Sequence, residues 1–316
     1  MRPFLSLEKG NGSALSEMIE SCFMSNSLPK SKTFENEKAS TYHAKIPDAN
    51  GFVHYDAEEH AVWGDLVARQ TPLVKRDMVG IWQEGAEKLG LLSQNGERKL
   101  LPSTPEISEK LQKMTGWKME AVPAVIGFER FYEMLSEKVF PAASFIRRRE
   151  HFDYVEEPDI FHEIFGHAPL LTHPAFAQFC QKIGETGKKC APKDRAWLIR
   201  LFWFSIEFGL MQENGQPKGL GAGLASSVEE LQWSVSGKPE YHKFDVMNIL
   251  RTSFRIDIPQ VLYFVLESPD QLFGILDRDL HADIQKARAL GLFEPKFPPK
   301  KGQKAPKQPK IEEVSC

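Results

Sequence analysis

The sequence predicts a mainly α-helical fold with a few short strands, organised as a single large domain. Apolar residues recur at helical spacing through most of the chain, and glycine and proline separate the helical segments. Apolar runs of strand length are few. With 316 residues, of which 41% are hydrophobic and 26% charged, the chain is long enough to bury one large core.

The first expected helix covers residues 57–70. Asp56 followed three positions later by Glu59 is typical of a capping box, and Trp63 and Leu66 begin the apolar side of the helix. The same kind of pattern predicts further helices over about 75–92, 104–115, 129–137, 174–187, 194–213, 227–234, 246–251 and 269–289, and strands over 144–147 and 261–266.

Composition divides the chain into three parts. Residues 1–40 are rich in Ser, Asn, Lys and Glu and predict a mostly disordered tail, although apolar residues at 15–23 follow a helical spacing. That short segment is interpreted as a transient helix or as a docking helix. Residues 41–292 form the expected globular domain. Residues 293–316 predict a basic disordered tail, because six lysines and four prolines occur between 296 and 310.

Charge and sequence signals limit the class of protein. A formal net charge of -3 provides no basic field for nucleic acid, and no apolar run approaches the roughly 18 residues of a membrane span. The four cysteines lack paired metal-ligand spacing, which favours reduced thiols. The start of the chain has no apolar signal core. We therefore expect a cytoplasmic protein that binds neither nucleic acid nor membrane.

Two histidines and one glutamate form the strongest functional pattern. His162 and His167 lie in the apolar run 157–167, and Glu207 lies in the apolar run 203–210. Two imidazoles and one carboxylate are the ligand set of a metal site that keeps open positions for non-haem Fe(II) oxygen chemistry.

The spacing of the two histidines requires an interruption of an α-helix. Side chains five residues apart on an α-helix point about 140° apart, so an unbroken helix does not aim both imidazoles at one ion. Pro158 suits a first helical turn and Gly166 a left-handed end. This predicts a helix over 158–166 that contains His162, with His167 just beyond it. The spacing is also one residue too long for the zinc-protease motif His-Glu-x-x-His.

Glu207 lies on a segment that is apolar on nearly all sides. Such a helix is expected to be buried, and a buried carboxylate needs a counter-charge or a metal ion. The alternative is a salt bridge to Arg200 or a partly exposed face. For His162 and His167 the alternative is a pair of hydrogen-bonded, partly buried imidazoles.

An ordered series of longer motifs extends this pattern. The motifs are Pro158-Asp159-x-x-His162-Glu163-x-x-Gly166-His167, Phe176-Ala177-Gln178-Phe179, Glu207-Phe208-Gly209-Leu210 and Gly221-Ala222-Gly223-Leu224-x-Ser226-Ser227. From about residue 45 to 290 the chain resembles the aromatic amino acid hydroxylases, the pterin-dependent iron monooxygenases. Its compact form resembles the bacterial members that hydroxylate phenylalanine. The resemblance implies the single helical catalytic domain of that family.

The resemblance also implies cofactors and their ligands. His162, His167 and Glu207 are expected to bind Fe(II). Phe131 matches the aromatic residue that stacks on the pterin, and Glu163 matches the acid beside it; the cofactor is tetrahydrobiopterin or a related tetrahydropterin. Without the resemblance, Phe131 reads as a core residue and Glu163 equally well as an acid on a helix surface.

The substrate-binding residues follow from the same resemblance. Arg147 matches the arginine that holds the substrate carboxylate, although a shift of one residue selects Arg148. Gly223 and Ser226 match positions near the amino acid group of the substrate. Trp203 matches the tryptophan that lines the aromatic pocket in phenylalanine and tyrosine hydroxylases.

Two further positions bear on the choice of substrate. Val265 stands where tyrosine hydroxylases carry an acid, whereas Val155 departs from the Thr of animal phenylalanine enzymes. The resemblance therefore implies conversion of L-phenylalanine to L-tyrosine with O2 and a tetrahydropterin, by a monomer or small homo-oligomer. Hydroxylation of tyrosine or tryptophan is the alternative within the family. A metal-dependent hydrolase and a metal-stabilised binding protein are the alternatives outside it.

Overall fold

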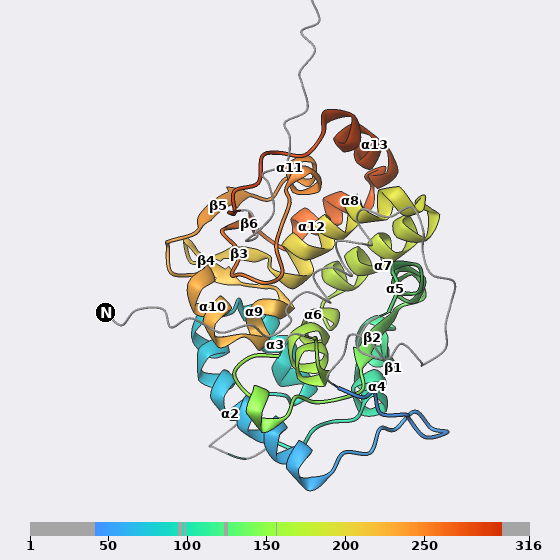
Figure 1. Ribbon diagram of the computed structural model, residues 1–316, viewed down its shortest axis with the longest axis vertical. Helices are drawn as coiled ribbons and strands as arrows, with labels where there is room; N and C mark the ends of the chain where they lie inside the picture. Colours follow the sequence, from blue (N-terminus) through green and yellow to red (C-terminus); the bar gives the residue numbers. More distant parts are fainter. Residues whose placement is uncertain (1–41, 94–96, 98, 123–125, 156, 299–316) are drawn as a thin grey trace, which may run out of the picture.

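The computed structural model describes residues 42–93, 97, 99–122, 126–155 and 157–298. The predictions for the tail 1–40, for the helical segment within it and for residues 299–316 lie outside the described residues. The described part is mainly helical and carries two small sheets (Figure 1), which confirms the predicted fold class.

Helices make up most of the described chain. Local sequence explains where two of the longer helices begin. Asp56 and Glu59 exchange hydrogen bonds in a capping box at the start of one, and Ser103 and Glu106 do so at the start of the other. The α-helices are α2 (Ala57–Asp77), α3 (Gly80–Leu89), α4 (Thr104–Thr115), α5 (Phe128–Ser136), α6 (Ala168–Leu171), α7 (Pro174–Lys189), α8 (Pro192–Phe202), α9 (Ala222–Ser226), α10 (Val228–Ser234), α11 (Val246–Arg251), α12 (Asp270–Leu276) and α13 (Leu280–Leu290). A short 3-10 turn, η1 (Arg149–His151), and two π-helical segments, η2 (Phe161–His167) and η3 (Trp203–Glu207), complete the set.

The strands form two separate sheets. They are β1 (Lys118–Val122), β2 (Val139–Ala143), β3 (Leu210–Glu213), β4 (Gln216–Gly219), β5 (Glu240–Lys243) and β6 (Leu262–Leu266). The first sheet pairs β1 with β2 in parallel, beside α4 and α5 (Figure 1). The second has the order β4-β3-β6-β5, in which β6 runs parallel to both neighbours. The strand β6, buried along its whole length, confirms the strand predicted over 261–266.

The helix predicted over 194–213 is too long. The helical backbone ends at Glu207, and the chain then forms the hairpin of β3 and β4 around Asn214 and Gly215. Both turn residues have positive φ, 52° and 77°, as a type I′ turn requires. The Asn-Gly pair was therefore a hairpin signal inside a segment whose apolar residues also fitted a helix.

Three other boundaries differ from the predictions. The strand predicted over 144–147 is wrong, because the strand of this region is β2 and the chain after it bends toward η2, where Phe145 O accepts a hydrogen bond from Ile160 N. The helix predicted over 269–289 is two helices, since Asp279 caps α13. The first helix continues through Pro72 to the end of α2 because its apolar side continues with the buried Val74.

Aromatic side chains pack the core behind η2. Phe161 stacks on Phe165 at 4.7 Å between ring centroids, Trp63 of α2 packs edge-on against Phe161, and Trp82 of α3 packs against Phe165. Helices α2 and α3 thus cover the apolar side of η2 and fix its position. Among the described helices, none is both long and apolar enough to cross a membrane.

We predict that Gly184→Ala lowers the free energy of unfolding by about 1–3 kcal/mol or more. A Cβ atom at this position of α7 would lie 2.3 Å from Ser136 N and 2.6 Å from Leu135 C, so helices α5 and α7 would have to move apart. Urea unfolding of both proteins measures the difference. The matched control is Gly274→Ala in α12, where a Cβ atom meets nothing within 4 Å and a small gain in helix stability is expected. Equal losses in the two variants would contradict the prediction.

Candidate metal centre

The two candidate histidines lie on a continuous π-helical segment. Segment η2 runs from Phe161 to His167 and continues directly into α6. Gly166 is not among the described glycines with positive φ. The prediction that a helix ends at a left-handed Gly166, with His167 beyond it, is therefore wrong.

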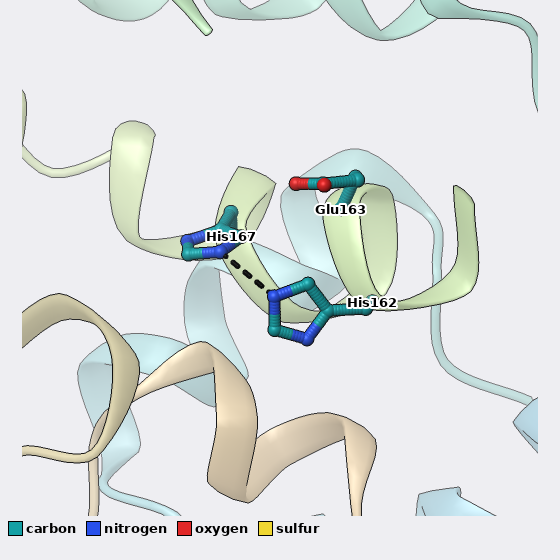
Figure 2. A group of neighbouring side chains, drawn as sticks. All are labelled: His162, Glu163 and His167. Atoms are coloured by element: carbon teal, nitrogen blue, oxygen red, sulfur yellow. Dashed lines mark hydrogen bonds between the residues drawn. The ribbon is translucent and has the colours of Figure 1, made fainter. Parts of the chain in front are cut away.

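The π-helical geometry brings the two imidazoles together, which the sequence analysis expected from a break in an α-helix at Gly166. In a π-helix each hydrogen bond joins residue i to residue i+5, so residues five apart lie nearly one above the other. His162 and His167 are five apart, and their Nε2 atoms lie 3.1 Å from each other. Figure 2 shows the two rings turned toward each other on the same stretch of helix, with Glu163 projecting on another side.

Gly166 serves close packing. A Cβ atom there would lie 2.9 Å from Ala222 O and 3.0 Å from Ala222 Cβ, so glycine lets η2 approach α9 closely. On the other side, Trp82 Nε1 donates a hydrogen bond to Gly166 O at 3.1 Å. The π-helical turn is therefore held between α3 and α9.

Glu207 comes from the second π-helical segment. In η3, Phe208 N donates to Trp203 O, five residues back, at 2.8 Å. Glu207 Oε1 lies 3.0 Å from His167 Nε2, and its Oε2 lies 3.5 Å from His162 Nε2. Arg200, the alternative partner, lies over the Trp197 ring at 5.0 Å. The ion-pair partners described for Glu207 are the two histidines.

The protonation states of this group suit a metal ion. Burial lowers the pKa of His162 to about 4, which outweighs the opposing effect of Glu207 and leaves the imidazole neutral at pH 7. Burial by itself raises the pKa of Glu207, but the neighbouring His167 and His162 bring it below its ordinary value, so the carboxylate is ionised. Neutral imidazoles and an ionised carboxylate are the forms that bind metals.

Ser226 determines which nitrogen of His162 carries the proton. Its hydroxyl donates to Ala222 O at 2.9 Å, so its oxygen accepts from His162 Nδ1 at 3.0 Å. The proton of the neutral ring is then on Nδ1, and Nε2 offers its lone pair toward His167 and Glu207. Outer partners of this kind orient the histidine ligands of metal sites.

The donor atoms have the separations that one ion requires. Ligand atoms about 2.1 Å from a metal and at right angles to each other lie about 3.0 Å apart. The Nε2–Nε2 distance of 3.1 Å and the distances from Glu207 of 3.0 and 3.5 Å are close to that value. The two imidazoles and the carboxylate therefore fit a metal ion bound on one face.

Glu163 is a second acid beside the two histidines. Its carboxylate and the two imidazoles offer donor atoms within 4.8 Å of one another. Burial, and then the negative charges of Glu207 and Asp159, raise the pKa of Glu163 well above its ordinary value. Glu207 is nearer to both histidines, and its pKa is lowered where that of Glu163 is raised, so Glu207 is the acid better suited to bind a metal ion.

Arg147 lies buried next to the same helix. Its Nε and Nη2 donate to Asp159 Oδ2 and Oδ1 at 2.8 and 2.9 Å, and Asp159 Oδ1 also accepts from His162 N at 3.1 Å. Arg148, by contrast, is half-exposed and lies over the Tyr42 ring. The structure thus links the arginine selected from the sequence to the first turn of η2.

The remaining predicted residues contact side chains that neighbour the three candidate ligands. The Trp203 ring lies 4.6 Å from the Phe208 ring, and a Cβ atom on Gly223 would lie 2.5 Å from the Phe208 side chain. Phe131 packs edge-on against Phe202 at 5.2 Å, and the Phe202 ring lies 6.1 Å from the His167 ring. The roles assigned to these residues in binding pterin and substrate stay predictions.

Sequence reasoning assigned no role to Asp159 or Gln260. Asp159 stands three residues before His162, directly ahead of an apolar helical run, and an acid in that position is an N-cap signal. Gln260 accepts a hydrogen bond from Trp203 Nε1 at 3.2 Å. It lies 57 residues away in the chain, and we find no local signal that would have indicated it.

Comparisons with known proteins place the chain in a family. Residues 18–286 match the family of biopterin-dependent aromatic amino acid hydroxylases. The chain is 46% identical over 265 residues to a phenylalanine-4-hydroxylase of Vibrio cholerae, covering 84% of this chain and 90% of that one. The apo structure of the cold-active phenylalanine hydroxylase from Colwellia psychrerythraea is 40% identical, with a TM-score of 0.78 over 82% of this chain and 99% of that one. The Chromobacterium violaceum enzyme with bound oxidised Fe(III) is 34% identical, with a TM-score of 0.72 over 78% and 91%.

We predict that Ser226→Ala weakens metal binding by about 10–100-fold, because His162 Nδ1 loses its acceptor and the ring loses its orientation. Anaerobic calorimetric titration with Fe(II) measures the affinity. The control Ser234→Ala removes another buried hydroxyl that bonds only to a backbone carbonyl, Leu231 O, and is expected to bind metal like the wild type. Equal affinities in all three proteins would refute the orienting role.

We predict that Asp159→Asn lowers the free energy of unfolding by about 3–5 kcal/mol at neutral pH, because Arg147 stays buried without its counter-charge. Burial alone raises the pKa of Asp159, but Arg147 holds it below its ordinary value. A lowered folded pKa gives stability that is complete above the unfolded pKa of about 3.9 and is lost as pH falls through the folded value.

Urea unfolding at several pH values tests the sign of this effect. The gap between the wild type and Asp159→Asn is expected to be constant from about pH 7 to 5.5 and to narrow below about pH 4. A gap that widens on acidification would contradict the assignment.

Proposed function

The chain belongs to the family of biopterin-dependent aromatic amino acid hydroxylases, and on that basis we propose that it converts L-phenylalanine to L-tyrosine with O2 and a tetrahydropterin. The observation that carries the proposal is the convergence of His162, His167 and Glu207, whose donor atoms have separations that fit one metal ion. That ligand set leaves open positions on the metal, as Fe(II) oxygen chemistry requires. Fe(II) and a tetrahydropterin, when bound, supply the activation of O2, which side chains alone do not provide.

Iron is the proposed metal for two reasons. The ligands are two imidazoles and a carboxylate, without thiolate, and the related Chromobacterium violaceum enzyme has been solved with bound oxidised Fe(III). In this chain the two histidines come from one π-helical turn and the carboxylate from another, so the two segments together would hold the iron.

We place the pterin at Phe131 and Glu163. Phe131 offers an aromatic face that is only partly buried, on α5 next to Phe202. Burial and the negative charge of Glu207 raise the pKa of Glu163 well above its ordinary value, which favours a protonated carboxyl group that can donate a hydrogen bond as well as accept one. A neutral acid beside the metal ligands adds no second negative charge when the cofactor binds.

We place the amino acid substrate at Arg147, Trp203, Gly223 and Ser226. Asp159 engages only part of the five N–H donors of Arg147, so the guanidinium retains donors for a carboxylate. Trp203 offers an indole face for the substrate ring. Gly223 and Ser226 lie on α9, which packs directly on η2.

Phenylalanine is the proposed substrate because Val265 stands at the position where tyrosine hydroxylases carry an acid. Val265 is buried on β6, which pairs with β3 immediately after η3. A valine there offers no polar partner for a ring hydroxyl, and an unpaired buried hydroxyl carries an energetic cost. Tyrosine is therefore disfavoured as a substrate relative to phenylalanine.

The decisive test is anaerobic reconstitution with Fe(II), tetrahydropterin and L-phenylalanine, followed by air and measurement of tyrosine. We predict tyrosine formation by the wild type and a fall to background in Glu207→Ala, because the metal loses its only anionic ligand of the three. Glu185→Ala, an exposed acid on α7, is the matched control and is expected to keep wild-type activity.

Two results would overturn the proposal. The first is tyrosine formation by the wild type no greater than by a His162→Ala variant. The second is faster hydroxylation of tyrosine or of tryptophan than of phenylalanine in the same assay, which would select the alternative substrates of the family.

A further inference from the structure

The indole of Trp203 is held by a buried side chain from a distant loop. Trp203 Nε1 donates to Gln260 Oε1 at 3.2 Å, and Gln260 is only 6% exposed. The indole stacks on Phe254 at 4.2 Å with 12° between the ring planes. Stacking fixes the plane of the indole, and the hydrogen bond fixes its direction within that plane.

Gln260 is itself fixed in one orientation. Its Nε2 donates to Arg255 O at 2.7 Å, so the amide oxygen is the atom that faces Trp203. Its backbone O accepts from Trp233 Nε1 at 2.8 Å. If the amide were flipped, Gln260 Nε2 would face the Trp203 N–H, and Gln260 Oε1 would face the Arg255 carbonyl oxygen. The observed orientation therefore satisfies both neighbours.

Glu230 anchors the backbone at Gln260. Glu230 Oε1 accepts from Gln260 N at 2.7 Å and from Tyr263 OH at 2.6 Å. Tyr263 lies on β6, two residues before Val265. The carboxylate of α10 therefore fixes both the loop that carries Gln260 and the strand that carries the apolar residue of the pocket.

We propose that Gln260 is a positioning residue that orients Trp203 against the aromatic ring of the substrate, and that Glu230 holds Gln260 in place for this role. The inference rests on the proposed function, because it takes Trp203 as the wall of the phenylalanine pocket. A buried indole N–H that loses its acceptor is energetically unfavourable. Without Gln260 Oε1 the ring therefore turns away from the pose that suits the substrate.

The test compares Gln260→Met, which keeps the length of the side chain and removes its hydrogen bonds, with the wild type. We expect about a tenfold rise in KM for phenylalanine and an equal weakening of phenylalanine binding by calorimetry, with KM for the tetrahydropterin unchanged. The matched control is Gln83→Met in α3, whose amide likewise donates to a backbone carbonyl, Met78 O, and which is expected to behave like the wild type.

A double-mutant cycle shows whether Gln260 acts through the indole. In a Trp203→Phe background the substitution of Gln260 is expected to have no further effect on KM for phenylalanine, since the ring has no N–H to position. An independent readout is the indole N–H resonance of Trp203 in an NMR spectrum, assigned by its absence from Trp203→Phe. We expect this resonance to shift in Gln260→Met and to stay unchanged in Gln83→Met.

Three outcomes would overturn the inference in a folded, metal-binding Gln260→Met protein. They are an unchanged affinity for phenylalanine, an undiminished effect in the Trp203→Phe background, and an unshifted Trp203 resonance. Absence of tyrosine from the wild type would instead count against the proposed function. The resonance and the calorimetric affinity for phenylalanine are read without turnover, so the two failures are distinguishable.

Discussion

Histidines five residues apart meet because the hydrogen bonds of η2 join residue i to residue i+5. A wide turn of this kind is less regular than an α-helix and depends on support from its surroundings. Here Trp82 donates to the carbonyl of Gly166 on one side, and the missing side chain of Gly166 lets Ala222 approach on the other. Ser226, one turn along α9 from Ala222, then reaches His162 Nδ1. The close approach of η2 and α9 therefore supports the turn that points the two imidazoles toward each other, and it also fixes the tautomer of His162.

A single buried carboxylate joins this helix to the proposed substrate side of the site. Asp159 accepts hydrogen bonds from the side chain of Arg147 and from His162 N. Movement of the guanidinium is therefore transmitted through Asp159 to His162, a candidate metal ligand. The pKa values of the nearby acids shift in different directions for a physical reason: Arg147 lowers the pKa of Asp159 and the histidines lower that of Glu207, whereas burial and the negative charges of Glu207 and Asp159 raise that of Glu163 against a backbone hydrogen bond from Ala143.

The mainly helical fold could be predicted from the spacing of apolar residues, and the three candidate metal ligands could be proposed from chemistry that is local in the sequence. A buried carboxylate at Glu207 requires a counter-charge, and a metal ion bound jointly with the two histidines would provide it. The π-helical turn was not predictable, because nothing in 161–167 distinguishes it from an α-helix; packing on Trp82 and Ala222 selects it. The hairpin after Glu207 was predictable from Asn214-Gly215, but the apolar residues before this pair also fitted a helix. Gln260 required knowledge of the tertiary fold, since only folding brings it to Trp203.

The position of Trp203 limits how the aromatic pocket can be adjusted. Trp203 begins η3 and Glu207 ends it, so one π-helical turn joins the indole to a candidate metal ligand. A backbone shift that moved the indole would also move the carboxylate and disturb the proposed metal site. The tilt of the ring on a fixed backbone is the remaining freedom, and it is governed by groups outside η3: Phe254 beneath the ring and Gln260 at its N–H. A small misplacement of reacting groups lowers the reaction rate strongly. Because the groups that hold the indole lie outside η3, the proposed pocket can change while the candidate metal ligands keep their geometry.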